Sequence, residues 1–216
     1  MNSNKTKNNR LKSFIDNPSK SLWRLAIPII AGMAIQTLYT IIDMIFIGRL
    51  GGESIAAVAF NFPIFFFIMG LTFGLGSGVT ASIARFIGAD DKVNADNAAE
   101  HSVVIAFILS LILTVLGLTY GKDILILMGC TDNVIDLSYD YLRISCYGIS
   151  FLIFSAFFRS ILSGEGDMKL PMVIAALGTV LNTILDPIFI FALDLGVAGA
   201  AWATTISQIV VFLIFV

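Results

Sequence analysis

The sequence predicts an all-α integral membrane protein, built as a bundle of six membrane-spanning helices. Of its 216 residues, 57% are hydrophobic and only 13% are charged, whereas a soluble domain carries about a quarter charged residues. The hydrophobic residues also gather into six runs, each close to the roughly 20 residues that a helix needs to cross a bilayer. Because so few charges cannot cover a water-exposed surface, lipid is the expected solvent for most of the chain.

Two segments with different composition make up the chain. Residues 1–24 are polar and basic and are expected to form a cytoplasmic tail, whereas residues 25–216 are expected to form a six-helix transmembrane lobe. The apolar run after the tail is longer than a signal-peptide core, so it should remain as a membrane anchor. The predicted spans are Leu25–Ile47, Ile55–Ala84, Ser102–Tyr120, Tyr139–Ser163, Leu170–Leu193 and Leu195–Val216.

Short polar or glycine-rich connectors separate these spans, which makes consecutive helices antiparallel neighbours. The expected connectors are Gly48–Ser54, Asp90–Asn97, Lys122–Asp136, Gly164–Lys169 and Asp194–Gly199. Lysine and arginine are enriched on the cytoplasmic side of membrane proteins. Here they favour the side of the N-terminus, so a multi-pass protein of the plasma membrane with a cytoplasmic N-terminus is expected. The basic residues on that side are Lys5, Lys7, Arg10, Lys12, Lys20, Arg24, Arg85, Lys92, Arg159 and Lys169, against Arg49, Lys122 and Arg143 on the other.

Catalytic and nucleic-acid-binding functions have no support in the sequence. The two cysteines are not arranged as C-x-x-C, and the chain holds a single histidine, so metal and redox sites are disfavoured. No nucleophile–base pair or phosphate-binding loop is present. We therefore expect a protein that is not an enzyme, with no catalytic residue, no cofactor and no nucleic-acid partner.

Two carboxylic acids lie inside predicted spans, Asp43 in the first and Asp186 in the fifth. Ionisable groups in the bilayer core are costly, and they usually mark functional sites. Each acid ends a run of polar residues spaced i, i+3, i+4 and i+7, which places the four on one helix face. The two polar stripes are Gln36, Tyr39, Thr40 and Asp43 in the first span and Thr179, Asn182, Thr183 and Asp186 in the fifth.

Both acids are expected in the outer half of the membrane. The first and fifth helices both run from inside to outside, and each acid lies in the second half of its span. Pro187 lacks an N–H and should free a carbonyl near Asn182 or Thr183. Thr204, Thr205 and Gln208 of the sixth span either complete a polar cavity or join helices by hydrogen bonds. Carboxylates beside interrupted backbone suit a site that binds H⁺ or Na⁺.

Four segments that cover nearly all of the chain after the tail resemble the multidrug and toxic compound extrusion (MATE) family. Their order and spacing, more than any one segment, carry the resemblance. The segments are IPIIAGMAIQTLYTIIDMIFIGRLGGESIAAVAF, GLGSGVTASIARFIGA, RSILSGEGDMKLPM and NTILDPIFIFALDLGVAGAAWATTISQ.

The resemblance implies one lobe of a two-lobe transporter, whose lobes are related by a pseudo-twofold axis. It also implies export of organic cations or other amphiphilic xenobiotics in exchange for Na⁺ or H⁺. Carried over from prokaryotic members of one branch, the cation-coupling site falls on Asp43, Asn182, Asp186 and Thr204, with Na⁺ at the first three. Gln36, Tyr39, Thr40, Thr179, Thr183 and Gln208 are the expected cavity-lining residues.

The sequence departs from the family in one respect, because the second six-helix lobe is missing. We expect either a fragment or a chain that pairs with another. A lipid-linked oligosaccharide flippase of the same superfamily is the alternative function, and a non-transporting fragment is another. Flippase substrates are anionic and favour basic cavity residues, whereas Arg143 and Arg159 lie near helix ends and the mid-span positions carry acids. This distribution favours cationic cargo.

Overall fold

The computed structural model describes the backbone of residues 18–216, with every side chain from Thr40 onward and some of those between residues 18 and 39. Long α-helices dominate this part of the chain, and one short π-helix interrupts them. The elements are α2 (Pro18–Gly48), α3 (Gly52–Gly88), α4 (Lys92–Leu127), α5 (Asp132–Gly164), α6 (Lys169–Pro187), η1 (Ile188–Ala192) and α7 (Gly196–Phe215).

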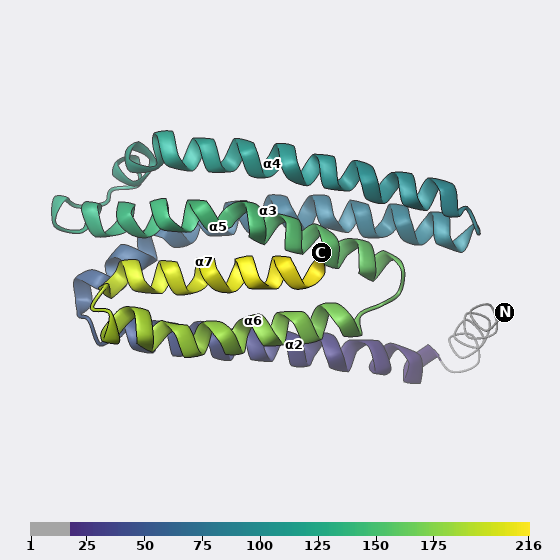
Figure 1. Cartoon of the computed structure of the whole chain (residues 1–216), viewed down its shortest axis with the longest axis horizontal. Helices are drawn as coiled ribbons and strands as arrows, with labels where there is room; N and C mark the ends of the chain where they lie inside the picture. The colour runs from purple at the N-terminus through teal and green to yellow at the C-terminus, as the bar shows by residue number, and fades with distance from the viewer. Residues whose placement is uncertain (1–17) are drawn as a thin grey trace.

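The six α-helices lie side by side and alternate in direction along the chain (Figure 1). α5 is central and packs against α3, α4 and α7, while α6 lies between α7 and α2. Within the described residues, α3, α4, α5, α6 with η1, and α7 are each long and apolar enough to cross a membrane. The predicted all-α bundle of six helices is therefore confirmed.

The helices extend well beyond the predicted spans, so two of the expected connectors are wrong. α3 has 37 residues and α4 has 36, about 55 Å each at 1.5 Å per residue, against a hydrocarbon core of about 30 Å. Polar residues beyond the core remain helical. In place of the expected loops at 90–97 and 122–136, the connectors cover only residues 89–91 and 128–131.

The residue at which a helix starts depends on local backbone hydrogen bonding, which a hydropathy profile does not show. The Asp91 side chain accepts a hydrogen bond from the Asn94 backbone N–H at 3.1 Å, which satisfies a free donor in the first turn of α4. α2 begins at Pro18, inside the segment expected to be a tail. Proline is favoured at a helix start because the N–H that it lacks has no helical partner there.

α6 turns small and polar residues inward and most of its large apolar residues outward, although Ile174 is buried. Gly178, Asn182 and Asp186 are buried at intervals of four residues, whereas Leu177 and Ile184 are exposed. A soluble helix has the opposite arrangement. The polar stripe predicted for this span therefore faces the interior of the bundle.

Two apolar clusters form the core. The larger follows α5 where it meets α3 and α4, through residues such as Leu142 and Ile153. The smaller lies at the end of the bundle where α2 and α6 terminate, and it joins α2, α3, α5, η1 and α7. Its buried members are Ile47, Val58, Tyr141, Ile144, Ile190, Val197, Ala200 and Ala201.

Candidate functional site

Asp43 and Asp186 lie on two parallel helices that pack against each other, near the same end of the bundle. α2 and α6 contact one another and run in the same direction (Figure 1). Asp43 is five residues before the end of α2, and Asp186 is the next-to-last residue of α6. Both side chains are buried, with exposed fractions of 9% and 0%. Neither acid therefore faces the lipid.

The apolar cluster at this end shows that the two acids lie at a similar depth. Ile47 and Ile190 belong to that one cluster and are both fully buried. Asp43 and Asp186 each precede their isoleucine by four residues, about one helical turn. Because α2 and α6 are parallel, the acids lie about one turn deeper than a shared apolar layer. Since α2 and α6 pack against each other, the two acids belong to the same part of the bundle.

Asn182 and Thr204 complete a hydrogen-bonded chain with Asp186. Asn182 is buried one turn before Asp186, and Thr204 is contributed by the neighbouring helix α7. In the amide orientation that satisfies both ends, Asn182 Nδ2 donates to Asp186 Oδ2 at 2.8 Å. Asn182 Oδ1 then accepts from Thr204 N at 3.0 Å and Thr204 Oγ1 at 3.2 Å.

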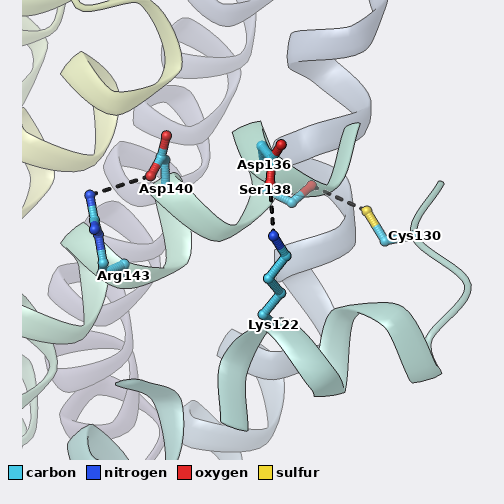
Figure 2. Close-up of polar contacts among 6 residues, drawn as sticks. All are labelled: Lys122, Cys130, Asp136, Ser138, Asp140 and Arg143. Atoms are coloured by element: carbon cyan, nitrogen blue, oxygen red, sulfur yellow. Dashed lines mark hydrogen bonds and ion pairs between the residues drawn. The ribbon is translucent and has the colours of Figure 1, made fainter. Parts of the chain in front are cut away.

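One carboxylate oxygen of Asp43 has no hydrogen-bond partner among the described residues. Asp43 Oδ1 is fully shielded from solvent, and a buried polar atom without a partner costs free energy. The charge also lacks a basic neighbour, since the ion pairs formed in this part of the chain are Lys122–Asp136 and Asp140–Arg143 (Figure 2). The site is therefore acidic, buried and incompletely satisfied.

The backbone beside the site departs from α-helix immediately after Pro187. η1 is a π-helix, closed by a hydrogen bond from Leu193 N to Ile188 O at 2.9 Å. π-turns inside helical segments are rare and occur often at functional sites. The sequence placed the irregularity before Pro187, near Asn182 or Thr183, whereas α6 continues as a helix through both residues.

The other residues expected to line a cavity have mixed surroundings. The Thr183 hydroxyl donates to Thr179 O of its own helix at 2.9 Å, and both residues are half-buried. Gln208 lies against Gly148 of α5 rather than α6, and Thr40 is exposed. The side chains of Gln36 and Tyr39 lie outside the described residues.

Asn61 is a buried polar residue that the sequence reasoning missed. It is fully buried in α3, and its Nδ2 donates to Ala57 O at 2.9 Å and to Ser138 O of α5 at 3.0 Å. Its Oδ1 has no partner among the described residues. An amide inside the otherwise apolar second span was the available signal, since such groups commonly join membrane helices.

Comparison with known proteins gives a consistent picture. The family model described as MatE matches residues 28–188. The chain is 34% identical over 203 residues to the probable multidrug resistance protein YoeA of Bacillus subtilis (strain 168), a match that covers 90% of this chain and 44% of that protein. It is 30% identical over 193 residues to the FAD transporter of Shewanella oneidensis, covering 88% of this chain and 43% of that protein.

The same correspondence extends to three dimensions. A solved structure described as the outward-facing conformation of a multidrug resistance MATE family transporter of the MOP superfamily aligns with a TM-score of 0.85 and 42% identity. The alignment covers 89% of this chain and 43% of that one. The chain thus spans less than half the length of the relatives that it matches.

Proposed function

This chain belongs to the MatE family of multidrug efflux transporters, and from that premise we propose that it forms the ion-coupling lobe of an exporter. The exporter moves organic cations or other amphiphilic xenobiotics out of the cell in exchange for Na⁺ or H⁺. The observation that carries the proposal is the buried acid pair Asp43 and Asp186, which has no basic partner among the described residues. A bound cation supplies the missing positive charge.

Asp43 and Asp186 have complementary roles in this proposal. Asp186 Oδ2 accepts from Asn182, so its position is fixed by α6 and α7. Asp43 Oδ1 has no hydrogen-bond partner in the part of the chain that the structure describes, and it binds the proton or coordinates Na⁺. Because both carboxylates are buried on helices that pack against each other, one cation bound between them relieves their mutual repulsion.

The Asn182 amide holds Asp186 in place within the proposed site. Its Nδ2 donates to Asp186 Oδ2 at 2.8 Å, and its Oδ1 accepts from Thr204 N at 3.0 Å and from Thr204 Oγ1 at 3.2 Å. Because Thr204 belongs to α7, the position of the carboxylate is fixed by two helices.

The backbone beside Asp186 also supports an ion site. α6 passes directly into the π-helix η1 at Ile188, so the helix geometry changes two residues after Asp186. Discontinuous helices of this kind form ion sites in other secondary transporters.

A second six-helix lobe is part of the proposal, supplied either by the same polypeptide or by another chain. In two-lobe transporters the cargo passes between lobes that rock against each other. The relatives named above differ in cargo, so the cargo of this protein is inferred from the charges in its own lobe. Buried acids favour cationic cargo over the anionic substrates of a flippase.

The proposed location is the plasma membrane, with the N-terminus in the cytoplasm. The excess of lysine and arginine on the N-terminal side supports this orientation. It places Asp43 and Asp186 in the outer half of the membrane, one turn inside the apolar layer of Ile47 and Ile190.

Transport by the full-length gene product in proteoliposomes tests the proposal. Efflux of a fluorescent organic cation is measured with a Na⁺ gradient at fixed pH, and separately with a pH gradient without Na⁺. We expect one of the two gradients to drive efflux, and Asp43→Asn to reduce that efflux at least about tenfold. Asp140→Asn, which changes an exposed acid near the same end, is the matched control and should transport normally. Undiminished efflux in Asp43→Asn would count decisively against the coupling site.

A further inference from the structure

Arg159 is a half-buried arginine near the end of the bundle opposite to the two acids. It lies five residues before α5 ends at Gly164, within a predicted membrane span. Its Cζ lies 5.3 Å from the ring centroid of Phe73 on α3. A cation over an aromatic ring is held by the electrons of the ring face, which fixes the guanidinium without using its N–H groups.

The N–H donors of Arg159 have no acceptor in the part of the chain that the structure describes. No carboxylate lies within ion-pairing distance there, and none of the hydrogen bonds described for residues 40–216 uses the guanidinium. Arginine carries five N–H donors and remains charged. Leaving them unpaired in a half-buried position is costly, so the guanidinium lacks a partner among the described residues.

A second unsatisfied group lies one turn away on the same helix. Ser155 precedes Arg159 by four residues, a spacing that places both on one helix face. Ser155 Oγ is shielded from solvent and has no hydrogen-bond partner among the described residues. The face therefore carries a cation and a hydroxyl that both lack an acceptor.

This face of α5 is directed between its two neighbouring helices. Phe158 contacts Phe212 of α7, with ring centroids 6.1 Å apart, while Ser160 O accepts from Thr80 Oγ1 of α3 at 2.9 Å. Successive helix residues differ by about 100°, so Arg159 projects between the side that meets α3 and the side that meets α7.

The apolar surface beside this face is aromatic. Phe151, Phe154 and Phe158 of α5 and Phe212 and Phe215 of α7 form a group of rings whose neighbouring centroids lie 5.4–6.4 Å apart. All five are only partly buried. An apolar tail can therefore lie against rings while its polar head meets the guanidinium.

We propose that Arg159 and Ser155 bind the anionic head group, a phosphate or a carboxylate, of an amphiphile, while the phenylalanine rings contact its apolar part. The guanidinium fork matches two oxygens of such a group, and the serine hydroxyl donates to a third or to the same oxygen. The site is separate from the ion-coupling acids and does not depend on their role. Its ligand reaches it either from the bilayer, as a lipid, or from water, as a soluble anion.

Binding of dodecyl phosphate to the full-length protein in a neutral maltoside detergent tests the site, with native mass spectrometry as the measurement. We expect Arg159→Gln to weaken binding about tenfold, because it removes a charge-assisted fork. Arg159→Lys keeps the charge but not the fork, and should give an intermediate affinity. Arg143→Gln is the matched control, since Arg143 pairs with Asp140 near the opposite end, and it should bind like the wild type.

Competition by inorganic phosphate distinguishes the two sources of the ligand. Displacement of dodecyl phosphate would assign the site to water-borne anions, and failure to displace it would assign the site to amphiphiles from the bilayer. Whichever source supplies the ligand, the affinity for dodecyl phosphate must fall in Arg159→Gln. An unchanged affinity in Arg159→Gln, or an equal loss in Arg143→Gln, overturns the proposal.

Discussion

Two kinds of carboxylate lie near the same end of this bundle, and they are satisfied in opposite ways. Asp136 and Asp140 are exposed, with side-chain fractions of 82% and 53%, and each faces a basic side chain at 2.9 and 3.4 Å (Figure 2). Asp43 and Asp186 are buried; Asp186 accepts from the Asn182 amide, and Asp43 Oδ1 has no partner among the described residues. Water screens the exposed pairs, so each contributes little to stability. The buried acids have no such screening, and in the proposed function a bound cation compensates their charge.

The sharpest test of this difference is to neutralise one acid of each kind. Asp186→Asn removes the charge that Asn182 holds in place, and we expect ion-driven efflux by the full-length protein to fall at least about tenfold. Asp136→Asn should leave efflux unchanged, because its charge is solvated. Equal efflux from the two variants would show that the buried and the exposed acids do not differ in function.

A large effect on stability is expected where η1 approaches α7. A Cβ added at Gly199 would lie 2.5 Å from Phe189 O and 2.6 Å from Phe189 C, both backbone atoms. Gly199→Ala therefore requires the π-helix to move, and overpacking of this kind costs about 1–3 kcal/mol. Thermal unfolding in detergent measures the loss. Gly88→Ala, where an added Cβ meets no atom within 4 Å, should unfold at the wild-type temperature or above it.

A smaller effect is expected from the hydroxyl that anchors the amide. Thr204→Val removes the Oγ1 that bonds Asn182 at 3.2 Å and keeps the side-chain shape. A hydrogen bond of this kind contributes about 1 kcal/mol, so cation affinity should fall about fivefold in an ion-binding titration. Thr183→Val removes a hydroxyl that bonds only its own helix, and it should bind the ion as before. A fivefold loss in the second variant as well would show that the hydroxyls act through helix stability.

The smallest effect is expected at the exposed pair. Lys122→Ala breaks the ion pair to Asp136, yet both side chains remain in water, so the unfolding temperature should hardly change. Any difference from the wild type should disappear between low salt and about 1 M salt, because ions screen exposed charges. A difference that persists in high salt would mean that the pair is less solvated than its exposure indicates.

Helix boundaries show where reasoning from hydropathy fails. The apolar run Ser102–Tyr120 gives the membrane-crossing part of α4, but the helix extends from Lys92 to Leu127. The first turn of α4 is stabilised by the Asp91 cap. Its residues are polar, so a hydropathy profile does not show that they are helical. Asn61 and Arg159 were underestimated for a related reason. Asn61 carries no charge and is not part of a polar stripe, and Arg159 was placed near a helix end, where a basic residue is common.

The sequence by itself determined the class, the number of helices and the polar faces. Few charges and long apolar runs exclude a water-exposed surface, and the helical period then places Asn182 and Asp186 on one face whatever the packing. Only the tertiary structure decided which faces meet. The packing of α2 against α6, the contact of Asn182 with Thr204, and the lack of an acceptor for Arg159 among the described residues all depend on how separate helices pack. In lipid, helices pair by close packing and hydrogen bonding rather than by hydrophobic burial, and local patterns do not specify such contacts.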